Sequence, residues 1–326
     1  MGWSKRDTLK AGVAGLLAPA ALWAQGTFPA KPLHFVVPYP PGGIADSMAR
    51  LLQPVLQAQL GQTVIVENKS GAGGNVGTEF VAKSQPDGYT ILFGASGPLS
   101  VNKSLYKGRM GYDPDRELRG VAQLAAFPLV LIASKNAPFS STQTFLAWLK
   151  KSGEAQSFGS AGNGTPQHLA AELFARSAGV KLVHIPYRGA APAIVDMMGG
   201  RIPFMFEIAG GAIPHIKSGN VQGLAVTSSE RLKALPEVPT LSESGLPGFN
   251  FTAWNGASVP SGTPDAIVAR LNQAFNQALR DPAIQRRWDE LGSLVATGPA
   301  SQFDALVHSE SRRLGALVTE LGIKPD

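Results

Sequence analysis

The residues that stand out chemically are the prolines and glycines of residues 36–46, VVPYPPGGIAD. Proline fixes φ and lacks an amide donor, and glycine leaves the neighbouring amides uncovered. A short apolar run precedes this corner, and a helical pattern follows it with Asp46 in the first turn. Bare N–H groups and the positive end of a helix dipole therefore meet at the end of a strand, an arrangement that binds anions.

A second glycine-rich loop follows the next expected strand. Residues 68–77 read NKSGAGGNVG and lie between a strand at residues 63–67 and a helix through Ala82. The spacing is not G-x-G-x-x-G, because Val76 replaces the third glycine, so a dinucleotide site is not indicated. Two interpretations remain, tight turns alone or a second set of uncovered amides. We favour the amides because the loop precedes a helix.

The later part of the chain repeats this strand, loop and helix pattern. Residues 157–160 end a strand, AGNG follows, and Thr165 with Pro166 predicts a helix start. The loop has the spacing of a P-loop, but Thr165 stands where that motif requires Lys, so nucleotide binding is not indicated. A further corner, residues 187–189 (YRG), follows a strand at residues 182–185.

Signatures of catalysis are missing from the sequence. The chain has no cysteine, and its five histidines show no H-E-x-x-H spacing, so we expect no metal and no cofactor. Ser96 lies in GASGP, where Pro98 breaks the nucleophile elbow. We read Ser96 either as a hydroxyl at the edge of a cleft or as a turn residue.

Composition indicates a compact protein of two lobes. The chain has 326 residues, 44% hydrophobic and 16% charged, and a formal net charge of +6. A chain of this length exceeds the size at which one core keeps growing. No basic run resembles a nucleic-acid footprint, so we expect no nucleic-acid partner. A slightly positive surface tolerates anionic ligands.

The N-terminus is typical of an export signal. Lys5 and Arg6 precede the apolar residues 11–23, and a processing site ends at Ala24. Residues 4–10 resemble the twin-arginine pattern with Lys in place of the first Arg, which leaves the export route open between the twin-arginine and general secretory pathways. An ordinary buried helix is the alternative. We favour the signal because an extended segment follows it.

Strands alternate with helices, which predicts an α/β fold of two lobes, each a mostly parallel sheet flanked by helices. Residues 121–134, broken at Pro128, and residues 251–259 are the expected crossover strands. Residues 25–125 plus 251–326 then form lobe 1, and residues 126–250 form lobe 2. We expect Pro54 to kink or split the first helix and Pro192 to begin another.

Several segments together resemble the Bug family, the periplasmic solute receptors of tripartite tricarboxylate transporters. They are VVPYPPGGIAD, VIVENKSGAGGNVGTEFVAKSQPDGYT, FGSAGNGTPQHLAAELF, HIPYRGAAPAIVDMMGGRI, LAVTSSERLKALPEVPTLSESGLPGF and TAWNGASVPSGTP. They occur in the family's order over nearly all of the chain after the signal. The resemblance implies a type II periplasmic-binding-protein fold with a ligand held between the lobes.

The resemblance also implies how the ligand is held. Backbone amides, hydroxyls and ordered water from two loops of the first lobe would meet its carboxylate, in place of an arginine clamp. Carried onto this chain, with the cleft-edge Ser96, the first-lobe candidates are Tyr39, Pro41, Gly42, Gly43, Asp46, Gly71, Ala72, Gly73, Gly74, Asn75 and Ser96. The second-lobe candidates are Ser160, Gly164, Thr165, His168, Tyr187, Arg188, Gly189 and Glu207. Glu207 replaces the family's usual Asp, and Lys103 its usual Pro.

Alternatives stay open for several of these side chains. Asp46 is first a helix N-terminal charge, and we expect it to order its loop rather than face an anion. His168 either contacts ligand or packs on the adjacent strand. Arg188 either pairs with a second carboxylate or is a solvated charge at the rim. Tyr39 and Tyr187 either flank the ligand or pack in the hinge.

The predicted function is therefore a non-catalytic periplasmic receptor. It would bind a dicarboxylate or tricarboxylate, an acidic amino acid or an aromatic acid, as a monomer, and dock on transporter membrane subunits or a sensor protein. The alternative is a periplasmic hydrolase or isomerase of a carboxylic acid, for which the sequence offers no nucleophile–base pair.

Overall fold

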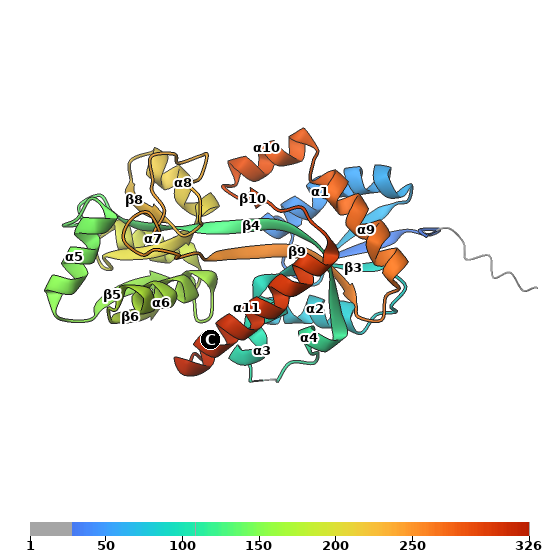
Figure 1. Ribbon diagram of the computed structural model, residues 1–326, viewed down its shortest axis with the longest axis horizontal. Coiled ribbons are helices and arrows are strands. Elements are labelled where there is room, and N and C mark those ends of the chain that lie inside the picture. Colours follow the sequence, from blue (N-terminus) through green and yellow to red (C-terminus); the bar gives the residue numbers. More distant parts are fainter. Residues whose placement is uncertain (1–27, 108, 326) are drawn as a thin grey trace, which may run out of the picture.

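Two long antiparallel strands connect the two halves of the molecule (Figure 1). They are β4 (Leu118–Ser134) and β9 (Thr252–Pro260). The computed structural model describes residues 28–107 and 109–325. The strand order is β2-β1-β3-β9-β4-β7-β5-β6, and β8 and β10 (Leu294–Val295) also pair with β4. The proposed signal peptide and its cleavage site at Ala24 lie outside the described residues.

The first half is built on three parallel strands, with β1 between the other two. They are β1 (Leu33–Val37), β2 (Val64–Asn68) and β3 (Thr90–Ala95). The longer helices of this half are α1 (Ile44–Leu60), α2 (Asn75–Ala82), α9 (Asp265–Ala278) and α10 (Pro282–Glu290). Shorter helical segments are η1 (Ala72–Gly74), η2 (Gly97–Val101), α3 (Asn102–Leu105) and α4 (Pro114–Glu117).

Helix α1 ends as predicted, at Gly61 in the left-handed conformation, with its N–H bonded to the Gln57 carbonyl. The predicted split at Pro54 is wrong, because α1 continues through it. Pro54 lies on the exposed side of the helix, so water can satisfy the carbonyl that its missing N–H leaves unpaired.

The second half repeats the parallel arrangement in β5 and β6, and β7 extends it. Its strands are β5 (Gln156–Ser160), β6 (Leu182–Pro186), β7 (Phe204–Ile208) and β8 (Val221–Val226). Its helices are α5 (Thr142–Ser152), α6 (Pro166–Ala178), α7 (Ala190–Met198) and α8 (Ala209–Lys217). Thr165 caps α6 and Pro166 begins it, as predicted. Helix α7 begins two residues before the predicted Pro192, because Gly189 serves as its N-cap.

The crossover strand β4 is not broken at Pro128, contrary to expectation. Pro128 pairs with Thr252 at the end of the β4–β9 ladder, and from Leu129 onward β4 pairs with β7 and β8 instead. The Leu129 amide donates to the hydroxyl of Thr227 (2.8 Å). Proline therefore stands where β4 changes partners, a place where a missing donor costs little.

Helix α11 (Ala300–Glu320) runs diagonally past both halves (Figure 1). Phe303 packs edge-on against Trp254 of β9, with ring centroids 5.4 Å apart. Leu314 and Leu317 belong instead to the aromatic core around Phe145, Phe158 and Phe204. This helix therefore packs on both halves. The lobe boundaries at residues 125/126 and 250/251 are a proposal.

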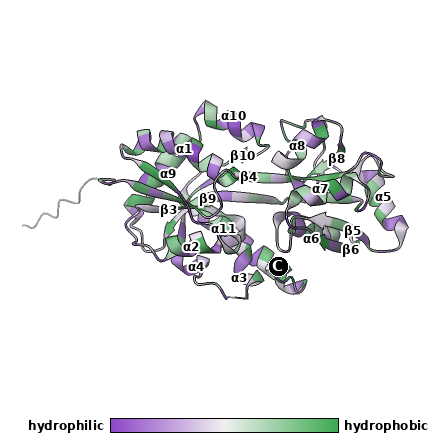
Figure 2. Cartoon of the chain, turned by 180° about the vertical axis from the view of Figure 1, so that it is seen from behind, coloured by the Kyte–Doolittle hydropathy of each residue, from purple (hydrophilic) through white to green (hydrophobic). Residues whose placement is uncertain are grey.

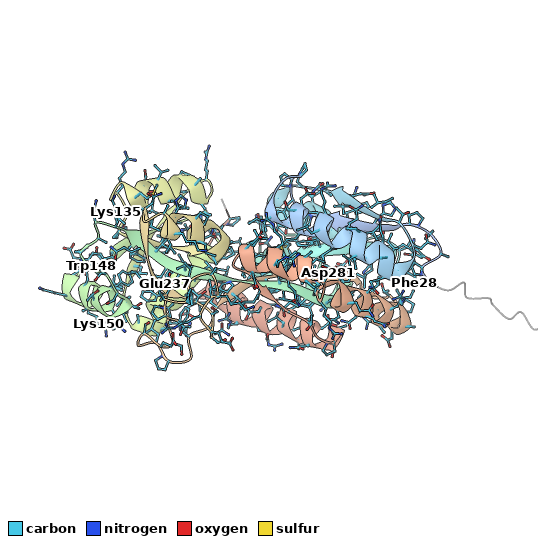
Figure 3. The ribbon with its side chains drawn as sticks, turned by 90° about the horizontal axis from the view of Figure 1, so that it is seen from above. Phe28, Lys135, Trp148, Lys150, Glu237 and Asp281 are labelled. Carbon is cyan, nitrogen blue, oxygen red and sulfur yellow. The ribbon has the colours of Figure 1, made fainter. Side chains whose placement is uncertain are left out.

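Hydrophobic and hydrophilic residues are interspersed along α1 and α10 (Figure 2). Phe28 and Asp281 lie in one half, and Lys135, Trp148, Lys150 and Glu237 in the other (Figure 3). No helix among the described residues combines the length and apolar character that a membrane crossing requires.

Candidate functional site

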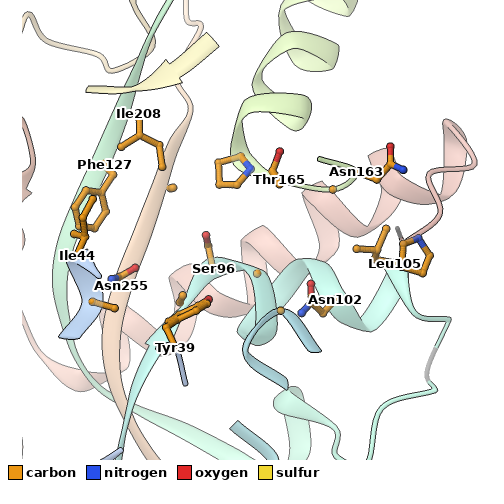
Figure 4. A pocket seen from close by; sticks show the side chains of 18 of the residues that line it. Tyr39, Ile44, Ser96, Asn102, Leu105, Phe127, Asn163, Thr165, Ile208 and Asn255 are labelled. Carbon is orange, nitrogen blue, oxygen red and sulfur yellow. The ribbon is translucent and has the colours of Figure 1, made fainter. Parts of the chain in front are cut away.

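A cavity of about 580 Å³ lies between the two halves, against the crossover strands (Figure 4). Both halves and the crossover strands contribute to its wall, which consists of Tyr39, Ile44, Ala45, Gly73, Ala95, Ser96, Gly97, Asn102, Leu105, Tyr106, Phe127, Asn163, Gly164, Thr165, Pro166, Ile208, Ala253, Asn255 and Pro325. None of these described residues is Asp, Glu, Lys or Arg. The polar part of the wall therefore consists of hydroxyls, side-chain amides and backbone, so an anion here would be held by neutral donors.

The N-terminus of α1 faces this cavity, since Ile44 and Ala45 line it. Gly43, the N-cap, has no side chain to accept from the first-turn amides, so these donors are left for another partner. The dipole of the 17-residue helix adds positive potential at the same place. Pro41 and Gly43 themselves are exposed and do not line the cavity.

Asp46 is turned away from the cavity into a network of its own. Its carboxylate accepts from the Gly42 amide (2.9 Å), Arg50 Nε (3.0 Å) and Asn68 Nδ2 (2.9 Å). The hydrogen bond from Arg50 lowers its pKa to about 2, with further help from Gly42 and Asn68 against the effect of burial. Asp46 orders the loop, as expected. The Gly42 amide, which we had expected to face a ligand, donates to Asp46 instead.

In the second loop, Gly73 faces the cavity. A Cβ built on Gly73 would lie 3.8 Å from Tyr106 Oη and 3.9 Å from Asn102 Nδ2. Gly71 and Gly74 do not line the cavity, and added Cβ atoms there would meet Val76 at 2.8 Å and Tyr39 at 3.1 Å. These two glycines therefore permit close packing.

Ala72, another predicted site residue, is outside the cavity wall and has a positive φ of 46°. It begins the short turn that contains Gly73.

Asn75 lies behind the wall. Its Oδ1 accepts from Asn102 Nδ2 (2.7 Å) and lies 3.1 Å from Tyr112 Oη. Asn75 is therefore placed to hold Asn102, which does line the cavity. The sequence reasoning missed Asn102 and Tyr106 as wall residues, although the unusual Lys103 had drawn attention to this segment.

In the second half, Gly164 and Thr165 line the cavity. The Thr165 hydroxyl donates to the Gly162 carbonyl (2.8 Å) and accepts from the His168 amide (3.5 Å). The Gly164 amide donates to His168 Nδ1 (3.1 Å), so it is already satisfied within the chain.

His168 and Ser160 contact this loop through hydrogen bonds and do not line the cavity. The ring of His168 stacks on His184 at 3.6 Å, and His184 Nε2 lies 2.6 Å from Ser160 Oγ. Burial and the neighbouring His168 lower the pKa of His184 to about 3. Of the two interpretations of His168, the structure favours packing against the adjacent strand.

The corner at residues 187–189 also lies outside the wall. Tyr187 Oη donates to Asp196 (2.9 Å), and Arg188 is exposed. The Gly189 amide donates to the carbonyl of Ala161 (3.2 Å), so the corner is linked to the loop that precedes Gly164.

Glu207 is buried beside the cavity without lining it. Burial raises the pKa of its carboxyl to about 7, against hydrogen bonds from Gln167 and the Ile208 backbone. Gln167 Nε2 lies 3.5 Å from Glu207 Oε2. The next residue, Ile208, turns the other way and does line the cavity, as side chains alternate along a strand.

The sequence reasoning also missed the contribution of the crossover strands. Phe127 of β4 and Ala253 and Asn255 of β9 all line the cavity. Alternation along β9 predicts that Ala253 and Asn255 share a face, but the sequence alone does not say which face borders a cleft.

The comparison with known families shows to which family the chain belongs. Residues 48–323 match the family described as the tripartite tricarboxylate transporter family receptor. The chain belongs to this family. It is similar to Protein BugT of Bordetella pertussis, with 36% identity over 312 residues that cover 95% of this chain and 94% of BugT.

Solved structures of similar proteins contain carboxylates. A Rhodopseudomonas palustris protein, Rpa4515 with adipate, is 30% identical, with a TM-score of 0.77 over 92% of this chain and 100% of the other. MatC from the same organism, with bound malate, is 32% identical, with a TM-score of 0.72 over 89% of this chain and 100% of MatC.

Membership in this receptor family confirms three predictions. The fold is the α/β fold of periplasmic binding proteins. The chain is a solute receptor and not an enzyme. Receptors of this family are periplasmic and work with membrane components of transporters.

Proposed function

We propose that this family receptor captures a small carboxylate in the cavity between its halves. The observation that carries the proposal is that the N-termini of α1 and α6 border one cavity whose wall has no acidic side chain. The dipoles of both helices favour an anion there, and the first-turn amides of α1 have no capping side chain. The adipate and malate in the related structures support the same ligand class.

The predicted residues divide into two groups in this proposal. Tyr39, Gly73, Ser96, Gly164 and Thr165 contact the ligand, together with Asn102 and Tyr106. The other predicted residues hold the contact residues in place, as Asp46 does for the first loop and His168 for the second-lobe loop. Because residues of both halves line the cavity, a bound carboxylate stabilises the arrangement in which the halves meet.

The chain is exported, with cleavage near Ala24, and acts as a monomer. The liganded receptor docks on the membrane subunits of a tripartite tricarboxylate transporter or on a sensor protein. Residues 25–125 plus 251–326 and residues 126–250 form the two lobes that move relative to each other.

A panel of carboxylates tests the proposal directly. Purified protein is incubated with mono-, di- and tricarboxylates while its melting temperature is followed, and each hit is measured by calorimetry. A ligand at a hundred times its Kd should stabilise the fold by about 2.7 kcal/mol. Analysis of the same samples for product should find the acid unchanged. If no carboxylate binds, the proposal is wrong.

A further inference from the structure

A cluster of buried polar side chains stands behind the first-half wall of the cavity. Tyr112 is 5% exposed and is not one of the wall residues. Its hydroxyl lies 2.9 Å from the Pro98 carbonyl and 3.1 Å from Asn75 Oδ1. A hydroxyl has one proton, so Tyr112 shares it between two acceptors that belong to different segments. The hydroxyl therefore connects the start of α2 with the turn η2.

Asn102 is the wall residue that this cluster holds. Its Nδ2 donates to Asn75 Oδ1 (2.7 Å), the same atom that contacts the Tyr112 hydroxyl. Cβ atoms built on Gly73 and Gly97 would lie 3.9 Å from Asn102 Nδ2 and 3.8 Å from its Oδ1. Both glycines line the cavity, and Asn102 borders it in Figure 4. A hydrogen bond from behind the wall therefore sets how the side-chain amide of Asn102 faces the cavity.

The segment that carries Tyr112 is itself held beside Asn102. Lys103 Nζ lies 2.8 Å from Asp113 Oδ1 and 2.6 Å from Asp115 Oδ2. Lys103 directly follows Asn102, and Asp113 directly follows Tyr112. These ion pairs and the hydrogen bonds of Tyr112 together close a ring of contacts. None of the three charged residues is in the described cavity wall, so they affect a ligand only through the residues that they hold.

We infer that Tyr112 is a positioning residue for ligand capture, which acts through Asn75 on Asn102. Without the hydroxyl, Asn75 Oδ1 keeps only Asn102 of its two partners, so both side-chain amides gain freedom to turn. The ring of Tyr112 packs with Leu99 and Trp254 whether or not it carries the hydroxyl. This inference rests on the proposed function, and it adds a residue outside the cavity wall.

Calorimetry of Tyr112→Phe tests the inference. The probes are benzoate, adipate, malate and citrate, and the one that binds the unmodified protein most tightly is used throughout. Tyr112→Phe should weaken its binding about tenfold, as expected for the loss of a buried hydrogen bond. Tyr89→Phe is the matched control in the same half, because the Tyr89 hydroxyl accepts from the Ala30 amide (2.8 Å) and lies outside the cavity wall. Its affinity should match that of the unmodified protein.

A double variant distinguishes positioning from a general loosening of the fold. In the Asn75→Ala background the Tyr112 hydroxyl has no route to Asn102, so Tyr112→Phe should weaken the probe by less than twofold there. Equal weakening in both backgrounds would overturn the inference, and so would unchanged binding by Tyr112→Phe alone. Either result leaves the proposed function intact. If no probe binds the unmodified protein, the proposed function fails and the inference fails with it.

Lys103→Met tests the ion pairs of the ring without a second substitution. It should weaken the same probe about threefold, because partly exposed ion pairs contribute less than a buried hydrogen bond. Lys31→Met is its control, since Lys31 forms an exposed ion pair with Asp87 (3.2 Å) outside the cavity wall. Equal affinities of the two variants would overturn the assignment of Lys103 to the ring.

Discussion

Gly73 is the glycine of the first-lobe loops whose side-chain position opens onto the cavity. Its φ of +64° favours glycine, and a built Cβ would have only ordinary contacts. Gly73→Val should weaken carboxylate binding at least a hundredfold, because the side chain would occupy cavity space beside Tyr106 and Asn102. The backbone strain should cost about 1–2 kcal/mol of stability. Calorimetry and urea unfolding measure the two effects.

Gly61→Val is the control for Gly73→Val. Gly61 has nearly the same backbone angles, φ 69° and ψ 19° against 64° and 24°, and nothing lies within 4 Å of its built Cβ. Its loss of stability should be similar, while its affinity for the ligand should match that of the unmodified protein. Unchanged binding by Gly73→Val would remove that loop from the site.

Two titratable groups, the half-buried His184 and the buried Glu207, give the stability opposite dependences on pH. The pKa of His184 falls from 6.5 to about 3 in the folded chain. Between these values the unfolded chain binds more protons, so acidification destabilises the fold. The pKa of Glu207 rises from 4.5 to about 7. Between those values the folded chain binds more protons, so acidification stabilises it. The two effects oppose each other between pH 4.5 and 6.5.

Single variants of His184 and Glu207 should separate their two effects on the pH dependence of stability. Relative to the unmodified protein, His184→Gln should gain stability as the pH falls from 6.5 to 4.5, and Glu207→Gln should lose it. Either slope is at most about 1.4 kcal/mol per pH unit. Urea unfolding at pH 6.5, 5.5 and 4.5 measures the slopes. Parallel pH profiles for the two variants would show that neither group titrates as its burial implies.

At the scale of elements, the start of α6 connects the second-half loop to the fold. Thr165 both caps α6 and bonds the Gly162 carbonyl, so one hydroxyl sets the helix start and the loop. Thr165→Ala should cost about 1 kcal/mol of stability and weaken ligand binding, because the loop loses its anchor. Thr165→Ser keeps the hydroxyl and should restore most of both. Urea unfolding and calorimetry of the pair distinguish this from the mere loss of a methyl group, which would leave Ser and Ala equally affected.

At the scale of the whole molecule, Leu105 of the first half and Gly164 of the second half lie close together where both line the cavity. A Cβ on Gly164 would lie 3.6 Å from Leu105 Cγ, so cysteines at both positions come close to disulfide geometry. The chain has no other cysteine. Leu105→Cys with Gly164→Cys should therefore cross-link cleanly under oxidising conditions, and faster with ligand because ligand favours the closed arrangement.

Titration of free thiols measures how much of the double variant is cross-linked. The Leu105→Cys single variant is the control, because its cysteine has no partner within the chain and stays titratable. A double variant that stays reduced both with and without ligand would show that the halves do not close over the cavity as in this structure.

Much of the fold could be predicted because the signals that begin and end elements are local. Gly61 ends α1 and Thr165 with Pro166 begins α6, each through hydrogen bonds to residues within four positions. Helix α8 was not anticipated. It contains Gly210, Gly211 and Pro214, which disfavour a helix, and it depends on packing by Ala212 and Ile213 against the second-half core.

The sequence by itself determined the family, the α/β class and the glycine-rich loops that follow the strands, since these depend on residue order and nearby chemistry. Only the tertiary structure decided which donors face the cavity. His168 of α6 accepts from the Gly164 amide because stacking on His184 of β6 orients its ring. Phe127 and Ile208 complete the wall because β4 and β7 are paired side by side. Whether an amide is free and which face of a strand borders a cleft are set by neighbours distant in the chain, and no local pattern records them.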